Sequence, residues 1–185
     1  QTDKQPFTII SESARVKFAR PFSIRNPDTG RPVAVVLQGR VRITGPDGLV
    51  IVGRDFVYSE ESKSIWSDLP VTFRQGRHSG KADRGIQIDL EIDPAAVARD
   101  EMAIAGIRNL TLSNNITLNL VPEKQENVEN IIVRCDGTLD FDTQTNVATF
   151  RNNVRVSAPT GERTTDSLSC DTLKLVFVES EEPTS

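Results

Sequence analysis

An internal repeat constrains the fold of this chain more than any other sequence feature. The stretch from Val50 to Ile92 recurs in looser form from Val133 to Leu175, at an offset of 83 residues, the difference between 50 and 133. Repeated strand units are typical of solenoids and of long stacked sheets. The offset pairs these apolar positions: Val50 with Val133, Phe56 with Leu139, Tyr58 with Phe141, Val71 with Val154, Phe73 with Val156, Leu90 with Leu173, Ile92 with Leu175, and the triplet Val33, Val35, Leu37 with Ile116, Leu118, Leu120.

The strands are indicated by alternation. From Ile86 to Ile92 apolar and polar residues alternate without interruption, which predicts one face on a core and the other in water. Shorter alternating runs are separated by Gly, Asn and Asp phrases, for example at 26–30, 45–48 and 151–153, which predict strand-reversing turns. The pattern is that of an all-β sandwich, jelly roll or solenoid.

One segment interrupts the strand pattern and predicts a short helix at about residues 94–100. Asp93 is a good N-cap, Pro94 suits the first helical position, and alanines follow. The polar stretch 122–130 has almost no apolar residue to anchor it and predicts a loop.

Charge and hydropathy exclude several functional classes. The formal net charge is -4, and no run of Lys and Arg supplies the basic patch that nucleic acid requires, so we expect no nucleic-acid partner. No segment approaches the roughly 20 apolar residues that span a bilayer, and the first residues lack the layout of a signal peptide. Residues 178–185 are acidic and predict a tail or linker.

Catalytic and metal-binding residues are sparse. The one histidine, His78, lies in a Gly-rich turn beside Ser79, and neighbours in a turn rarely face each other as nucleophile and base. The acidic groups 89–93 and 136–142 lack the spacing of a calcium loop and favour the solvated face of a strand. We therefore expect no enzyme activity, no catalytic residue, no cofactor and no metal.

Two cysteines, Cys135 and Cys170, stand 35 residues apart in the similar phrases CDGTL and CDTL. In stacked strands such echoed positions can lie side by side, within the Cα separation that a disulfide requires. The alternative is two separate thiols buried as small apolar residues. The spacing alone leaves both open.

Several phrases, taken in their order and spacing from Val33 to Phe177, resemble the repeat of the LptC, LptA and OstA-like family of lipopolysaccharide transport proteins. Gly39 to Ile43 and Asn153 to Val156 match one phrase of that repeat, and Asp55 to Tyr58 and Thr165 to Leu168 match another. Ser67 to Phe73, followed by Gly80 to Asp83, resembles the LptC-like passage to a second strand pairing. The helix near Pro94 and the polar stretch at Pro122 depart from a regular stack.

The resemblance implies an open, twisted β-jelly roll of two facing antiparallel sheets with stacked strand repeats. Residues 1–177 would form one such domain from two related halves, about 33–92 and 116–175. The implied function is non-enzymatic: a periplasmic module that binds or conducts lipopolysaccharide, or a similar acylated glycolipid, and shields its acyl chains between the sheets. The implied partners are other Lpt-type jelly rolls, joined by edge-strand pairing, and an inner-membrane transporter complex. Some members of the family are also tethered to the inner membrane, which for this protein would require a segment outside this sequence.

The alternative is a structural β-solenoid segment of a larger envelope protein, with a dry core and no lipid. Cavity volume distinguishes the two, because a conducting protein needs an open trough and a scaffold is close-packed. In the lipid-binding case the alternating apolar positions of the strands would line the interior: Leu37, Val41, Ile43, Phe56, Tyr58, Val71, Phe73, Ile86, Ile88, Leu90, Leu118, Phe141, Val154, Val156, Leu173 and Leu175.

Overall fold

The protein is a long antiparallel β-structure in a computed structural model that describes residues 7–25, 27–45, 48–99, 104–122, 130–159 and 165–177. The predicted loop at 122–130 therefore lies mostly outside the described residues, and the acidic tail 178–185 lies wholly outside them. The elements are β1 (Thr8–Phe18), β2 (Pro32–Thr44), β3 (Val50–Ser59), β4 (Ser64–Ser67), β5 (Val71–Gln75), β6 (His78–Ala82), β7 (Ile86–Ile92), α1 (Pro94–Ala98), β8 (Ile104–Ser113), β9 (Ile116–Leu120), β10 (Ile131–Cys135), β11 (Thr138–Asp142), β12 (Val147–Pro159) and β13 (Thr165–Val176).

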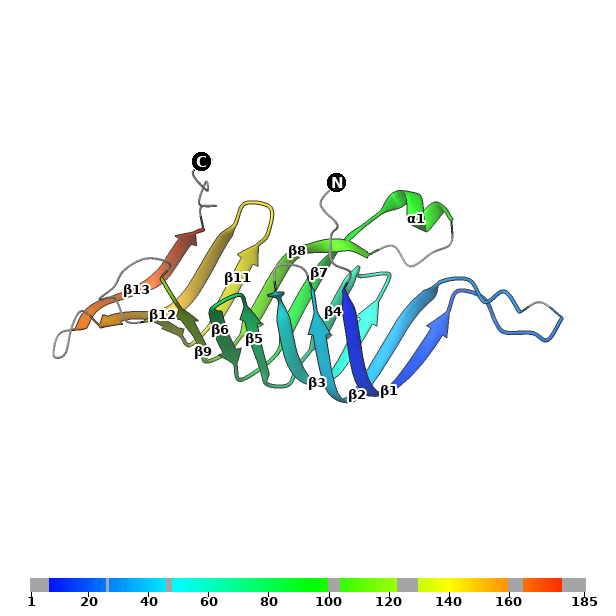
Figure 1. The fold of residues 1–185 in the computed structure, drawn as a ribbon, viewed down its shortest axis with the longest axis horizontal. Helices are drawn as coiled ribbons and strands as arrows, with labels where there is room; N and C mark the ends of the chain where they lie inside the picture. The colour runs from blue at the N-terminus through cyan, green and yellow to red at the C-terminus, as the bar shows by residue number, and fades with distance from the viewer. Residues whose placement is uncertain are drawn as a thin grey trace, which may run out of the picture.

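The thirteen strands form one hydrogen-bonded sheet that is folded lengthwise into two facing layers (Figure 1). The long strands belong to both layers. The Val57–Ser59 end of β3 pairs with β4, whereas its Val50–Val52 end pairs with β5. Strand β12 divides in the same way between β11 and β10.

The short strands complete the two layers. One layer, which we call layer 1, continues through β4, β7, β8 and β11, and the other, layer 2, through β5, β6, β9 and β10. The chain changes layers at the corners, whereas the β5–β6 and β7–β8 connections reverse it within one layer. The all-β, open jelly-roll architecture expected from the sequence is confirmed.

A row of corners joins the two layers. Each pass of the chain bends at the same level, and the bends use left-handed backbone at Gly39, Asp55, Gly85, Asn114, Asn115, Asn152 and Asn153. Asn and Asp tolerate this conformation better than other residues with a side chain, and Gly adopts it freely. The predicted turn at 151–153 is wrong in one respect: it does not reverse the chain but bends β12 from one layer into the other.

Hydrogen bonds tie successive corners together. The Gly39 amide donates to Asp55 Oδ1 at 2.7 Å. Further along, the Asp83 amide donates to the Asn114 carbonyl at 3.1 Å, and the Asn114 amide donates to the Gly137 carbonyl at 2.7 Å. The Asp136 amide donates to the Asn152 carbonyl at 3.0 Å. The corners therefore form a bonded ridge that fixes the register of both layers.

The one short helix among the described residues, α1, lies where the sequence predicts it. The Asp93 side chain accepts a hydrogen bond from the Ala95 amide at 2.8 Å, and Pro94 occupies the first turn. Figure 1 shows α1 outside the strand stack, at the end of β7. None of the described helices is long and apolar enough to cross a membrane.

The repeat offset of 83 residues holds for part of the fold. Val50–Tyr58 in β3 and Val133–Phe141 in β10 and β11 occupy equivalent passes, since both run from layer 2 to layer 1. The triplet Val33, Val35, Leu37 does not follow, because it lies in layer 1 and Ile116–Leu120 lies in layer 2. That part of the alignment matched alternation alone.

We expect the corner ridge to tolerate little added volume at Gly137. A Cβ there would lie 2.5 Å from the Arg151 carbonyl oxygen, so Gly137→Ala should destabilise the fold by about 1–3 kcal/mol in urea unfolding. Gly106→Ala is the matched control, because its Cβ would meet Glu91 Oε2 at an ordinary 3.4 Å. Equal stability of the two variants would contradict a tightly packed ridge.

Candidate functional site

The space between the layers is lined mainly by apolar side chains, and the burial of these side chains changes along the strands. Next to the corners Val41, Phe56, Leu112, Phe150 and Val154 are fully buried. Their counterparts further from the corners, at the open side, are only partly buried: Val35, Leu49, Phe73, Ile131, Leu120, Phe141 and Val156. The interior is therefore close-packed along the corner ridge, and in β2, β3 and β7 the close packing extends further out, since Ile43, Ile51 and Leu90 are at most 3% exposed. The side opposite the corners, which we call the mouth, is open where the partly buried residues lie.

A groove of about 380 Å³ lies at the mouth, midway along the molecule. Its walls come from both layers. Layer 1 contributes Leu110, Leu139, Phe141 and Ala148, and layer 2 contributes Phe73, Leu118 and Leu120, while Leu49, Gln75, Gly76, Arg77, His78, Val121, Asn146 and Phe177 form its rim.

The rim of this groove is held by local contacts. Phe177 packs edge to face on Phe141, with ring centroids 5.9 Å apart. Nδ1 of His78 accepts a hydrogen bond from the Val121 amide at 3.2 Å, so this imidazole nitrogen serves a backbone group. The arrangement is an apolar slot with a few polar groups at its entrance, and it has the shape of a binding site for an apolar chain.

All sixteen residues predicted to line the interior lie in its apolar cluster. Eleven of them are buried, and three, Phe73, Leu118 and Phe141, line the groove itself. Further apolar groove residues lie outside that predicted set: Leu49, Leu110, Leu120, Leu139 and Phe177. Alternation shows which face of a strand a residue occupies but not how far from the corner it lies, so it could not separate packed from open positions. Leu120 and Leu139 did belong to the repeat pattern.

The candidate disulfide between Cys135 and Cys170 does not form, and both thiols are free. Of the two alternatives that the spacing left open, the side-by-side arrangement does not occur, because β12 lies between the two cysteines. Val154 pairs with Cys170, and the β10–β12 register, in which Arg134 pairs with Arg155, sets Cys135 on the other side of Val154. Two strand spacings give a separation of about 9–10 Å, beyond the reach of a disulfide.

The acidic residues near β11 have structural partners. Asp140 forms an ion pair with Arg151 and accepts the Thr111 hydroxyl at 2.9 Å, and Asp136 accepts from Asn153 at 2.6 Å. The pKa of Asp142 is lowered because its carboxylate accepts the backbone amides of Thr145 and Gln144. In the described part of the chain no three His, Cys, Asp or Glu side chains gather as metal ligands would.

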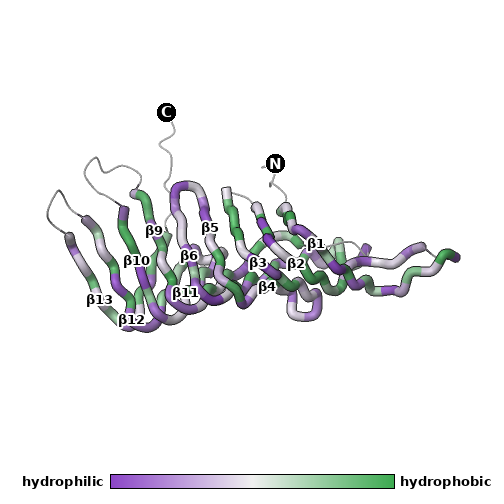
Figure 2. Tube along the Cα trace, turned by 90° about the horizontal axis from the view of Figure 1, so that it is seen from below, coloured by the Kyte–Doolittle hydropathy of each residue, from purple (hydrophilic) through white to green (hydrophobic). Residues whose placement is uncertain are grey.

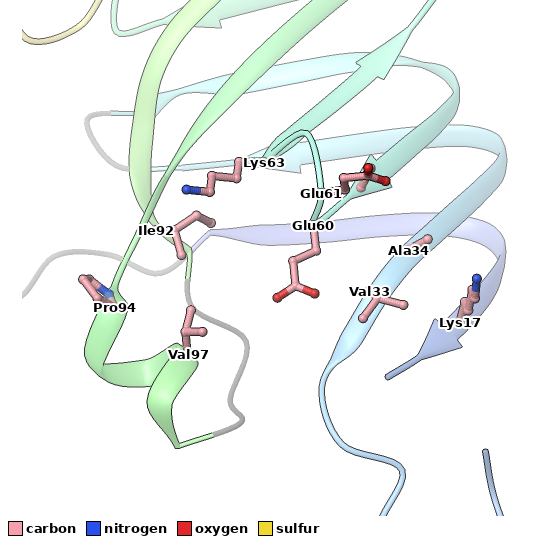
Figure 3. Close-up of a pocket in the computed structure, with 10 residues that line it drawn as sticks. Lys17, Val33, Ala34, Glu60, Glu61, Lys63, Ile92, Pro94 and Val97 are labelled. Carbon is pink, nitrogen blue, oxygen red and sulfur yellow. The ribbon is translucent and has the colours of Figure 1, made fainter. Parts of the chain in front are cut away.

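A second cavity of about 630 Å³ lies beneath α1, at the β1 end of the molecule. Figure 3 shows its apolar side chains, Val33, Ile92 and Val97, and the carboxylate of Glu60 pointing into the space between Val97 and Val33. Glu60 is ion-paired with Arg31. A buried or half-buried carboxylate interrupts an apolar surface, so the groove at the mouth is the better site for an apolar ligand.

No protein-family model, curated protein or solved structure matches this chain. The candidate site is therefore defined by the geometry of this chain alone.

We expect the two parts of the interior to respond differently to truncation. Phe150→Ala, in the close-packed part at 0% exposure, should cost about 3–5 kcal/mol of unfolding free energy. Phe73→Ala, in the open groove, should cost less than half as much, since its side chain is already partly exposed. Equal losses in urea titrations would show that the mouth is packed as tightly as the corner side.

The two thiols should differ in reactivity. Burial is the main cause of a raised pKa at Cys135, whose Sγ also lies 3.6 Å from the Thr138 carbonyl oxygen. Because the pKa of Cys135 in the folded protein lies above its ordinary value of 9.0, the neutral thiol contributes fully to stability at any pH below 9.0. This contribution is lost as the pH rises through the pKa of the folded protein. With a thiol reagent at pH 8, the partly exposed Cys170 should react first and Cys135 only on unfolding. Cys170→Ser is the control, and rapid loss of the remaining thiol would contradict the burial.

Proposed function

We propose that this protein is a non-enzymatic module that binds or conducts the acyl chains of lipopolysaccharide, or of a similar acylated glycolipid. The observation that supports this most is the open apolar groove between the two layers at the mouth. Every wall of the groove is apolar, and its polar residues lie only at the rim. Such a groove favours hydrocarbon chains, because its walls offer few hydrogen-bonding groups that a ligand would have to match.

The size and energetics of the groove are compatible with this role. Its volume of about 380 Å³ falls in the range of about 300–1,000 Å³ that is usual for small-molecule sites. Each CH₂ group that leaves water contributes roughly 0.8 kcal/mol, so a chain of several carbons is held without specific hydrogen bonds. The close-packed ridge keeps the layers together while the mouth stays open.

The two ends of the sheet are the proposed binding sites for partner proteins. Among the described residues β1 pairs only with β2 and β13 pairs only with β12, so each leaves an edge for another chain. Large exposed apolar side chains gather at the same ends: Ile9, Ile10, Val16, Phe18, Phe22 and Ile24 in β1 or just after it, and Leu168 and Val176 in β13. We propose that other Lpt-type jelly rolls add strands at these edges, and that one end meets an inner-membrane transporter complex.

The periplasm is the proposed location, and this part rests on the sequence resemblance. The same applies to an inner-membrane tether outside this sequence. The scaffold alternative has one observation in its favour, since eleven of the sixteen predicted lining residues are closely packed. An experiment on the groove decides between the two functions.

We expect a photocrosslinking amino acid at Phe73 or Leu120 to form an adduct with lipopolysaccharide when the purified protein is illuminated with it. Both positions face the groove. The matched controls are Arg74, the exposed neighbour of Phe73 on the outer face, and Val41, which is buried beside the corner. Adducts confined to Arg74, or equal at all positions, would reject lipid binding between the layers and favour the scaffold.

Blocking the groove gives a second readout of the same prediction. Leu118→Arg puts a charge on the groove wall and should abolish the adduct at Phe73, whereas Thr117→Arg, on the opposite face of β9, should leave it unchanged. Circular dichroism and urea unfolding of both variants show whether the fold is kept.

A further inference from the structure

The connection between β1 and β2 projects beyond the rest of the molecule. Figure 1 shows it as a narrow extension past the last strands at the β1 end. Backbone hydrogen bonds from Ala19 to Arg31 and from Arg20 to Thr29, both 3.0 Å, continue the β1–β2 ladder into it. An ion pair of 3.2 Å between Arg20 and Asp28 crosses it. We call residues 19–31 the hairpin tip.

Large apolar side chains on and next to this hairpin tip are exposed to water. Ile24 is 93% exposed and Phe22 is 70% exposed, which are the highest values among the large apolar residues described. Phe18, at the end of β1, is 43% exposed. Because these exposed aromatic and aliphatic side chains lie at a projecting tip, they do not contribute to the core. Packing of the fold therefore does not explain why apolar residues occupy these positions.

The charge around these side chains is positive on balance. From Ser13 to Arg31 the sequence has five basic residues, Arg15, Lys17, Arg20, Arg25 and Arg31, and one acidic residue, Asp28, which is ion-paired with Arg20, although the whole chain carries a formal charge of -4. Arginine and lysine beside exposed aromatic and aliphatic groups are the composition of segments that lie in a membrane interface. The cations approach anionic headgroups, and the apolar groups enter the layer beneath them.

We propose that the hairpin tip is a membrane-docking element that inserts Phe22 and Ile24 into the interface of a bilayer rich in anionic lipids. A convex tip needs no complementary pocket in its partner, and a bilayer accepts apolar side chains at whatever depth they reach. A protein partner would need a pocket for these two side chains. This proposal concerns a different part of the molecule from the groove and stands without lipid transport.

Vesicle binding by the full chain tests the proposal. We expect flotation with phosphatidylglycerol and phosphatidylcholine vesicles at low salt, and much weaker flotation with phosphatidylcholine alone. Phe22→Ser combined with Ile24→Ser should reduce partitioning about tenfold or more, because both apolar anchors are lost. Arg25→Gln should weaken binding and flatten its dependence on salt.

Matched control variants show whether vesicle binding depends on the hairpin tip or on other exposed residues. Leu168→Ser combined with Val176→Ser removes two exposed apolar groups, 51% and 66% exposed, from the opposite end of the sheet and should leave vesicle binding unchanged. Arg42→Gln combined with Arg134→Gln removes exposed cations from the outer face of layer 2 and should have little effect. Loss of binding in either control with no loss in the hairpin variants would overturn the proposal, as would capture of a protein partner through Phe22 without vesicle binding.

A depth measurement gives an independent readout. Trp66 is the one tryptophan in the chain, so Trp66→Phe combined with Phe22→Trp puts the only indole at the hairpin tip. We expect brominated lipids in anionic vesicles to quench its fluorescence, and the same indole at Val176 in the Trp66→Phe background to stay unquenched. Equal quenching at both positions, or none at the hairpin tip, would reject insertion.

Discussion

The fold depends on the constraint that every pass of the chain bends at the same level. An antiparallel sheet could run flat, with one face on a core and one in water. Here the bends at Gly39, Asp55, Asn114 and Asn152 fold the sheet lengthwise, so that the apolar faces of its two layers meet. Backbone hydrogen bonds between neighbouring bends keep them in line, and the apolar contact behind them is closed to water.

The same constraint explains the open mouth. Because the two layers are joined on one side only, the side opposite the corners can open, and it does so around the groove, where Phe73, Leu120 and Phe141 are only partly buried. Phe150 and Val154, one or two residues from the corner of β12, are fully buried, whereas Val156 is only partly buried. Figure 2 shows hydrophobic and hydrophilic residues alternating along the strands of both layers. One pattern therefore gives both a packed ridge and an apolar groove.

The ends of the molecule differ from its middle for a related reason. A central strand has neighbours on both sides, but β1 and β13 each have one neighbour within the described chain. Their side chains are correspondingly exposed, and apolar ones such as Ile10 and Val176 are 61% and 66% exposed. Free strand edges and exposed apolar side chains therefore gather at the ends of the molecule, whereas the apolar groove lies in its middle.

Local sequence patterns are sufficient to place the strands, their inward faces and the short helix. Alternation along Ile86–Ile92 is a local property of the backbone, and an N-cap such as Asp93 acts within its own turn. Three other properties follow only from the tertiary structure. They are how deeply each inward residue is buried, the bend at Asn152 that carries β12 from one layer into the other, and the position of β12 between Cys135 and Cys170. Those properties depend on which strands pair with each other. Alternation of apolar and polar residues shows which face of a strand is buried but not which strand lies beside it.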